Sequence, residues 1–583
     1  MIKKLLKSVR EYKKDSVLAP VFVIFESILE IAIPTLMAYL IDYGVNKKDI
    51  SYILEIGLAL VLCAVLSLIT GALAGRSSAI ASAGFAKNLR HDIFYNIQKF
   101  SFSNIDKFST ASIVTRLTTD VTNVQNAYMM VIRLAVRSPV MMICALIMAF
   151  HINIKISLIF LVIIPVLGFG LWYITISVHP IFERVFRTYD KLNNVVQENL
   201  HGIRVVKSFT REDHEDRKFG KISQAIFKNF TSAEKILAFN MPLMQVCIYT
   251  AMILISWLSA KAIVASGNNP ALGLSTGDLT SLFTYTMQIL MSLMMLSMVF
   301  VMIIISRSSA ERIVQVLDEE SDLKNCDNPV FDVKDGSIAF ENVTFSYARK
   351  TDKPVIDNVS ISIASGETVG ILGGTGSSKS SFVQLIPRLY DVISGSVSVG
   401  GVDVRSYDIE ALRNQVAMVL QKNILFSGTI KDNLLWGNEN AGDEDMKRAC
   451  ELAQADGFIQ EFPNKYDTFI EQGGANVSGG QKQRLCIARA LLKKPKILIL
   501  DDSTSAVDIK TDALIRHAFK EQIPDTTKII IAQRVSSVQD ADKIIVLDDG
   551  SINAVGRHDE LLKTCEIYRE VYESQSKGGV IDE

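Results

Sequence analysis

The stretch ETVGILGGTGSSKSSFVQLIPRLY, Glu367 to Tyr390, decides the fold of the second half of this 583-residue chain. It predicts a short apolar strand, a glycine-rich loop and a helix, in that order. Backbone N–H groups of such a loop, and of the helix start, face a bound phosphate. Gly373 and the pair Lys379-Ser380 fit the phosphate-loop pattern G-x-x-x-x-G-K-[ST], and Ser378 stands where that pattern has its second glycine.

The residue types of this loop indicate a nucleoside triphosphate with Mg²⁺ as the ligand. Lys379 is expected to reach the β- and γ-phosphates, and the hydroxyl of Ser380 to bind Mg²⁺. Ser378 in place of glycine costs conformational freedom where the backbone approaches the phosphates. The predicted phosphate-binding residues are Gly373, Gly374, Thr375, Gly376, Ser377, Ser378, Lys379, Ser380 and Ser381.

A second stretch, ANVSGGQKQRLCIARALLKKPKILILDD, runs from Ala475 to Asp502. Its Ser-Gly-Gly-Gln segment opens a helix, and the strand that follows ends at Asp501, a familiar position for a Mg²⁺-binding carboxylate. A helix start preceded by Ser-Gly-Gly is a second phosphate-binding device. One nucleotide rarely needs two such devices from one domain, so we expect two domains that face each other and supply one each.

The first half of the chain has the composition of a membrane protein. Overall 49% of the residues are apolar and the mean hydropathy is +0.26, and long runs with few charges occur up to about Ser306. A membrane helix needs roughly 20 apolar residues. We therefore predict a six-helix membrane domain over residues 1–325 and a second domain over 326–583. The six predicted spans are about 17–41, 53–73, 134–150, 156–176, 241–264 and 279–305.

The lengths of the connections between spans alternate. The links after spans one, three and five are short, whereas about sixty residues follow spans two and four. These long links keep a helical apolar period, so we predict helices that continue beyond the membrane, turn and return. The basic start MIKKLLKSVREYKK places the N-terminus inside by the positive-inside rule, and it is not a cleavable signal.

Charged residues within the predicted spans are few. The net charge of the chain is −1, so it produces no overall positive potential that would attract nucleic acid. Intramembrane charges usually face a cavity or a partner, although arginines can also lie in the inner interfacial zone. The methionines of the sixth span indicate either an adaptable lining or simple packing. The charged residues in question are Glu26, Glu30, Arg133 and Arg137.

These motifs, in this order behind six spans, resemble an ABC exporter half-transporter of the six-helix multidrug type. The resemblance covers essentially the whole chain, including the link GIRVVKSFTRE at Gly202 to Glu212. It implies an α-helical six-span transmembrane domain followed by an α/β P-loop ABC nucleotide-binding domain. It also implies ATP and Mg²⁺ as ligands and export from the cytoplasm or the inner leaflet.

The resemblance implies roles for further residues. Tyr347, in VTFSYARK, matches the aromatic residue that stacks on adenine, and Ser505 to Asp508 match the D-loop. Gln421 matches the Q-loop glutamine, which senses Mg²⁺ and contacts the membrane domain. The implied Mg²⁺ ligands are Ser380, Gln421 and Asp501. The implied signature motif is Val477, Ser478, Gly479, Gly480 and Gln481, with valine in place of the usual leucine.

Three positions depart from the family in one nucleotide site: Ser378, Asp502 and Gln533. Asp502 stands where a glutamate orients the attacking water, and its carboxylate is one methylene further back. Gln533 stands where a histidine contacts the γ-phosphate, and an amide carries neither a proton nor a positive charge. Because positioning and electrostatics supply most of phosphoryl-transfer catalysis, we predict a site that binds ATP but hydrolyses it poorly. The alternative is that the three residues changed independently and that the site still hydrolyses ATP.

The nearly intact signature predicts a heterodimer. It would complete a competent site on a second half-transporter that has the missing glutamate and histidine. We expect a multi-pass subunit in the lipid bilayer of a bacterial plasma membrane, with its nucleotide-binding domain in the cytoplasm and small amphipathic drugs or lipids as substrates. Alternatives are a regulatory ATP-binding subunit that gates its partner, a homodimeric lipid or peptide exporter, and an importer. A regulator should leave its partner's substrate range unchanged when its own cavity-facing residues are replaced.

Overall fold

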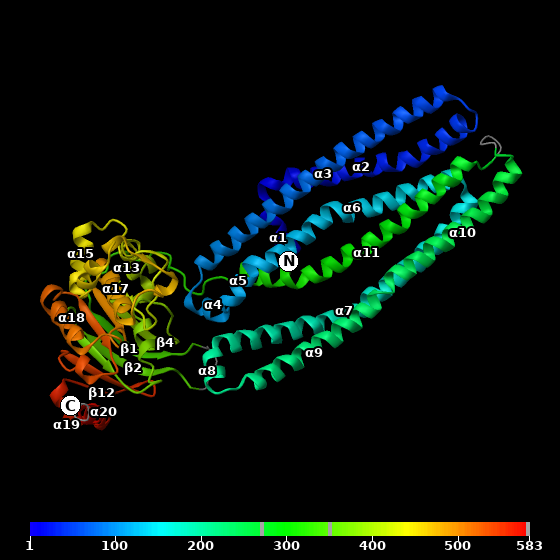
Figure 1. The fold of residues 1–583 in the computed structure, drawn as a ribbon. Helices are drawn as coiled ribbons and strands as arrows, with labels where there is room; N and C mark the ends of the chain where they lie inside the picture. The colour runs from blue at the N-terminus through cyan, green and yellow to red at the C-terminus, as the bar shows by residue number, and fades with distance from the viewer. Residues whose placement is uncertain (269–272, 348–352, 579–583) are drawn as a thin grey trace. The chain divides into compact units, whose positions relative to one another are not determined.

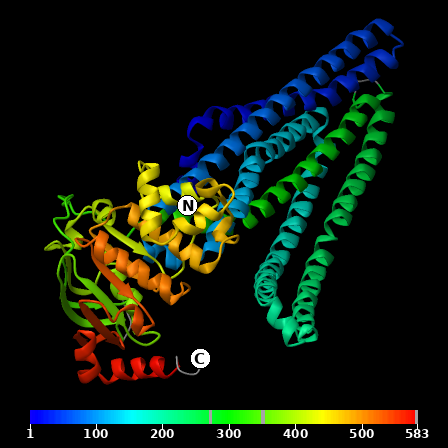
Figure 2. The same cartoon turned by 60° about the vertical axis from the view of Figure 1, so that its left-hand side comes forward.

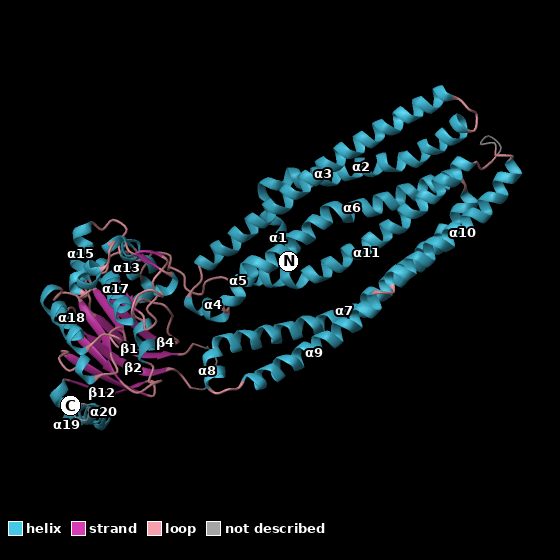
Figure 3. Ribbon diagram, viewed as in Figure 1, coloured by secondary structure: helices cyan, strands magenta, loops and turns pink. Residues whose placement is uncertain are grey.

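The computed structural model describes residues 1–268, 273–347 and 353–578 (Figure 1). It has one helical unit, residues 1–98 and 109–319, and one α/β unit, residues 99–108 and 320–583. Figure 3 shows the strands gathered in the second unit. The predicted fold class is confirmed. Residues 269–272 of the last inter-span link and 348–350 of the VTFSYARK stretch lie outside the described residues.

Six helical segments of the described chain are long and apolar enough to cross a membrane, and each contains one of the predicted spans. They are Ile2–Val45, Ile50–Gln98, Thr110–Ile152, Ile154–His201, Glu212–Ser266 and Thr276–Asp318. The elements of this unit are α1 (Ile2–Leu5), η1 (Leu6–Tyr12), α2 (Lys13–Tyr39), η2 (Leu40–Val45), α3 (Ile50–Gln98), α5 (Thr110–Thr115), η3 (Arg116–Asp120), α6 (Val121–Ile152), α7 (Ile154–His201), α8 (Ile203–Ser208), α9 (Glu212–Leu237), α10 (Asn240–Ser266) and α11 (Thr276–Asp318).

The long helices extend well beyond a bilayer, as the link lengths predict. Helices α3 and α7 have 49 and 48 residues, so each is about 70 Å long at 1.5 Å per residue. The hydrocarbon core needs only about 30 Å of that length. The GIRVVKSFTRE link forms the short helix α8 between α7 and α9, where the chain reverses direction (Figure 1).

Arg137 of α6 joins two carboxylates of α2. Its Nη1 donates to Glu26 Oε1 at 2.7 Å, and its Nη2 donates to both oxygens of Glu30 at 2.8 and 2.7 Å. Glu26 is only 7% exposed, and a Cβ at Gly71 of α3 would lie 3.0 Å from its Oε1. Helices α2, α3 and α6 therefore meet at one tightly packed ion cluster, which is the partner expected for an intramembrane charge.

The second unit contains three sheets. A six-stranded sheet has the order β12-β11-β3-β10-β9-β6, a four-stranded sheet has the order β2-β1-β4-β5, and β7 pairs with β8. The strands are β1 (Ile338–Phe345), β2 (Ile356–Ile363), β3 (Thr368–Leu372), β4 (Ser394–Val399), β5 (Val402–Asp403), β6 (Val416–Val419), β7 (Gly428–Thr429), β8 (Phe469–Ile470), β9 (Ile497–Asp501), β10 (Thr527–Ile531), β11 (Lys543–Asp548) and β12 (Ser551–Gly556).

Helices of this unit pack on one face of the larger sheet and the four-stranded sheet packs on the other, and every residue of β9 and β10 is buried. Parallel strands covered on both faces read as continuous apolar runs, which explains the sequence ILIL before Asp501. The helices are α4 (Phe102–Lys107), α12 (Lys379–Gln384), η4 (Val404–Ser406), α13 (Ile409–Gln415), α14 (Ile430–Leu435), α15 (Asp443–Leu452), α16 (Asp456–Glu461), η5 (Lys465–Asp467), η6 (Gln472–Gly474), α17 (Gly479–Leu492), α18 (Ile509–Gln522), η7 (Val535–Ser537), α19 (His558–Thr564) and α20 (Glu566–Gly578).

Candidate nucleotide site

The candidate site lies at one edge of the six-stranded sheet. Strands β3, β10, β9 and β6 are neighbours and run parallel, so their carboxyl ends meet at the same edge. The phosphate loop follows β3, Asp501 ends β9, Gln533 follows β10 and Gln421 follows β6. Ligands of open α/β sheets bind at this edge. The fold therefore brings together four segments that span more than 150 positions of the sequence, from Gly373 to Gln533.

The phosphate loop closes around the side chain of Lys379. Its Nζ donates to Gly373 O at 2.8 Å, to Gly374 O at 2.7 Å and to Ser377 Oγ at 3.2 Å. Gly373 is required at its position, because a Cβ there would lie 2.2 Å from Leu547 O. Burial lowers the pKa of the Lys379 amine, whereas the nearby Asp501 carboxylate favours its charged form.

Ser378 occupies the left-handed region, with φ of 70°, directly before α12. A side chain costs about 1–2 kcal/mol in this conformation, whereas glycine adopts it freely. The serine therefore adds strain to the loop where the usual pattern has a glycine. The backbone nevertheless follows the left-handed turn that a phosphate loop needs at this position.

We expect Ser378→Gly to stabilise the α/β unit by about 1 kcal/mol, because it relieves this strain. The thermal unfolding midpoint of the full chain's α/β unit should rise by roughly 2 °C, measured by calorimetry. Ser378→Ala is the matched control, since it keeps the Cβ and should give no gain. An equal rise for both variants would contradict the assignment of strain to the Cβ.

Ser380 and Asp501 lie beside each other, as a pair of Mg²⁺ ligands must. Ser380 Oγ donates to Asp501 Oδ1 at 3.0 Å, and Asp501 is 3% exposed. Burial raises the pKa of the Asp501 carboxyl, and the adjacent Asp502 carboxylate acts in the same direction. A hydroxyl and a carboxylate are the hard oxygen ligands that Mg²⁺ prefers, so these residues fit the ion. Bound there, Mg²⁺ would supply positive charge to a triphosphate.

Asp502 and Gln533, the two unusual residues, are hydrogen-bonded to each other. Gln533 Nε2 donates to Asp502 Oδ2 at 2.9 Å, and Asp502 N donates to Ile531 O at 3.1 Å. Burial raises the pKa of the Asp502 carboxyl, whereas hydrogen bonds from Gln533 and Gln421 oppose that rise. Gln533 is the side-chain donor that the described hydrogen bonds give Asp502, and Gln421, the third predicted Mg²⁺ ligand, lies near enough to lower the pKa of the same carboxyl. The amide of Gln533 therefore holds the carboxylate in place.

Tyr347, the predicted adenine-stacking residue, is half-exposed and held at its hydroxyl. The hydroxyl lies 2.9 Å from Ser381 Oγ, and it donates to Gln384 Oε1 at 3.2 Å. Its ring meets the ring of Tyr390 edge-on, with centroids 5.0 Å apart. Tyr390 in turn donates to Asp106 of α4 at 2.7 Å. The sequence analysis missed Tyr390, which is separated from Asp106 by more than 280 positions.

The signature segment caps helix α17 and packs on the D-loop. Ser478 Oγ accepts from Gln481 N at 3.2 Å, and Gln481 Oε1 accepts from Ser478 N at 2.9 Å. A Cβ at Gly480 would lie 2.9 Å from Ala506 O. Gln483 Oε1 accepts from Ala506 N at 3.0 Å, so a buried amide fastens α17 to the D-loop. The sequence analysis missed Gln483, whose only signal is a polar residue on the buried face of an amphipathic helix.

Among the described residues, the hydrogen bonds of the signature residues 477–481 stay within neighbouring residues of the chain, such as Ser478 with Gln481, and none reaches the phosphate loop. Each phosphate-binding device is built as a separate structure. This arrangement fits the expectation that the two belong to different nucleotide sites.

Comparisons with known proteins agree with this geometry. A family model described as "ABC transporter transmembrane region" matches residues 16–294, and one described as "ABC transporter" matches residues 356–505. The ABC transporter ATP-binding protein YfiB of Bacillus subtilis is 36% identical over 98% of both chains. This chain belongs to the ABC transporter family. Its residues 356–505 are therefore part of an ABC ATPase domain, and the whole is an ATP-driven membrane transporter.

This ABC transporter is also similar in sequence to a lipid flippase and in structure to a solved exporter. The ATP-dependent lipid A-core flippase of Desulfotalea psychrophila is 33% identical over 84% of both chains. A solved structure of a bacterial Atm1-family ABC exporter with ATP bound superposes with a TM-score of 0.83 at 24% identity. It covers 96% of this chain and 99% of the other. The superposition on the solved structure shows that the ABC transporter has the exporter fold.

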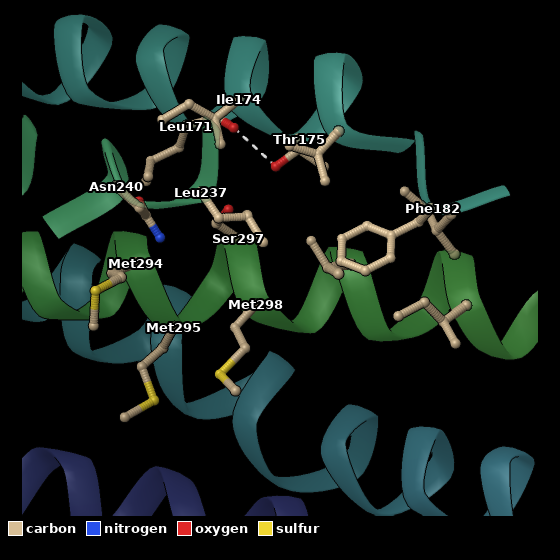
Figure 4. Close-up of a pocket in the computed structure, with 14 residues that line it drawn as sticks. Leu171, Ile174, Thr175, Phe182, Leu237, Asn240, Met294, Met295, Ser297 and Met298 are labelled. Atoms are coloured by element: carbon tan, nitrogen blue, oxygen red, sulfur yellow. Dashed lines mark hydrogen bonds between the residues drawn. The ribbon is translucent and has the colours of Figure 1, made fainter. Parts of the chain in front are cut away.

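The helical unit of the ABC transporter contains a cavity of about 440 Å³ between α7, α9, α10 and α11 (Figure 4). None of the described side chains that line it is charged, and Asn240 Oδ1 is buried without a hydrogen-bond partner among the described residues. The methionines of the sixth predicted span therefore include cavity-lining residues. The lining residues are Leu171, Ile174, Thr175, Val178, Phe182, Leu237, Asn240, Met294, Met295, Ser297, Met298, Val301, Ile304 and Ile305.

Proposed function

We propose that this chain is the degenerate-site subunit of a heterodimeric ABC exporter. Its own phosphate loop, with Ser380 and Asp501, binds ATP and Mg²⁺ but supports little hydrolysis. Its signature segment completes the competent site of a different half-transporter, which has the catalytic glutamate and the switch histidine. The pair moves small amphipathic compounds, drugs or lipids, from the cytoplasm or inner leaflet across a bacterial plasma membrane.

The hydrogen bond between Asp502 and Gln533 carries this proposal. It ties the shortened carboxylate to the amide that replaces the histidine. A shortened carboxylate whose oxygen already accepts from Gln533 is poorly placed to orient a water. A missing general base or water-orienting group commonly costs about 10²–10⁴-fold in rate. Binding of ATP depends mainly on the groups of the phosphate loop, and these are present.

The cavity supports transport by this chain over a purely regulatory role. Its volume and its uncharged, methionine-rich lining fit an apolar molecule with a few polar groups. Asn240 Oδ1, buried without a described partner, offers an acceptor for a donor on such a molecule. The name of the flippase relative points to an amphipathic lipid, which has the same chemical character.

The test is ATP turnover by this chain purified alone in lipid nanodiscs, with the oligomeric mass read from the same sample. We expect turnover close to that of the Lys379→Ala variant, which lacks the phosphate-binding amine and reports contaminating activity. Brisk turnover by a homodimer would contradict the proposal, and Asp502 would then be a working catalytic residue.

The partner is tested by restoring activity. Addition of the half-transporter that pairs with this chain should restore turnover, and Ser478→Ala in this chain should remove most of it. The same substitution would have no effect if this chain's signature segment took no part in the competent site.

A further inference from the structure

The C-terminal helix α20 holds the loop that carries Gln533. Gln575 Nε2 donates to Gln533 O at 2.8 Å, and Gln575 Oε1 accepts from Val535 N at 2.9 Å. One side-chain amide thus bonds to two backbone groups of the loop, two positions apart. Both the donor and the acceptor of the amide are used, so its orientation is fixed. Val535 is 1% exposed, and a buried N–H needs such a partner.

Helix α20 is itself firmly anchored, so it can serve as a fixed support. Tyr568 is fully buried, and its hydroxyl lies 2.7 Å from His558 Nδ1 of α19. The ring of Tyr572 meets the His558 ring edge-on, with centroids 5.2 Å apart. Tyr568, Tyr572 and Gln575 are spaced four and three residues apart, so they lie on one face of the helix. Figure 2 shows α19 and α20, in red, at one end of the α/β unit.

The two contacts of Gln533 form a chain of hydrogen bonds. Its backbone is held by Gln575 and its side chain donates to Asp502 at 2.9 Å. A change in the position of the loop backbone therefore moves the amide that faces the nucleotide edge. The support comes from a residue 42 positions further along, outside every motif of the nucleotide site.

We propose that Gln575 is a positioning residue for Gln533, through which helix α20 sets the grip on the γ-phosphate. The inference rests on the proposed function, in which this site binds ATP, and on the family resemblance, which implies that residue 533 contacts the γ-phosphate. Loss of the Gln575 amide loosens the loop and weakens retention of a triphosphate. Retention of ADP is unaffected, because ADP has no γ-phosphate for Gln533 to contact.

The central variant is Gln575→Met, which keeps the length of the side chain and removes both hydrogen bonds. Ser576→Ala is the matched control, since among the described residues its hydroxyl bonds to Tyr572 O within the same helix and not to the Gln533 loop. Release of ATPγS and of ADP, each with Mg²⁺, is measured on the full-length chain in nanodiscs. We expect Gln575→Met to release ATPγS about fivefold faster, the factor that one hydrogen bond commonly contributes. Release of ADP should stay unchanged in both variants.

Amide hydrogen exchange over residues 533–537, on the same samples, tests the positioning itself. Faster exchange in Gln575→Met but not in Ser576→Ala is expected, and equal exchange would overturn the inference. Faster exchange with unchanged ATPγS release, or equally faster ADP release, would overturn the link to the γ-phosphate. Gln533→Ala serves as the reference: if it leaves ATPγS release unchanged, the proposed role of Gln533 fails, while exchange still decides whether Gln575 holds the loop.

Discussion

Replacing Asp502 with glutamate and Gln533 with histidine together should raise ATP turnover of this chain alone by about a hundredfold or more. The longer carboxylate reaches further toward an attacking water, and the imidazole can carry a proton that the amide cannot. The change also breaks the hydrogen bond that ties Asp502 to Gln533. The remaining parts, the phosphate loop and the capped signature helix, are already built.

Each single substitution should give much less than the double one, because groups that act as a unit in catalysis are not additive. The measurement is phosphate release from the full chain in nanodiscs, for the wild type, both single variants and the double variant. Lys379→Ala combined with the double substitution is the background control. Turnover of the double variant at that background would show that the defect lies elsewhere, with Ser378 as the next residue to replace.

Replacing Arg137 with methionine should destabilise the helical unit by about 3 kcal/mol, the low end of the cost of breaking a buried ion pair, because Glu26 is buried while Arg137 and Glu30 are partly exposed. The substitution leaves Glu26 and Glu30 without the guanidinium that binds both of them. Glu26 is packed against Gly71 of α3, so it has little room to turn away. We expect a much lower yield of folded protein and a lower midpoint of thermal inactivation.

A triple variant separates charge from packing. Arg137→Met combined with Glu26→Gln and Glu30→Gln removes all three charges and should recover most of the lost stability. Arg133→Met, which removes the same charge one helical turn away, should cost far less. The readout is the fraction of protein that stays monodisperse after heating. A triple variant as unstable as Arg137→Met would show that the shape of the arginine, and not its charge, stabilises the cluster.

Much of the architecture is readable from local pattern. Runs of about 20 apolar residues can only be stable as membrane-spanning helices, so all six spans were predictable. The glycine-rich loop between an apolar strand and a helix predicts the position of Lys379 and Ser380 in the same way. The continuation of α3 and α7 beyond the membrane was predictable too, because their helical period continues past the apolar runs.

The supporting contacts of the nucleotide site could not be predicted in this way. Tyr390 reaches Asp106, and Gln575 reaches the Gln533 loop, across separations that carry no local signal. The pairing of Arg137 with both glutamates likewise depends on the packing of α2 against α6. One sequence shows which polar residues are present, but not which of them share a partner.

The sequence by itself determined the elements, their order and the types of residue at the nucleotide edge, because helical period, apolar length and loop chemistry are local properties. It also marked Asp502 and Gln533 as unusual. Only the tertiary structure decided that these two side chains bind each other, and that Gln575 holds the loop beneath them. Those contacts arise where parallel strands and a distant helix converge, and that convergence is a product of packing the whole unit.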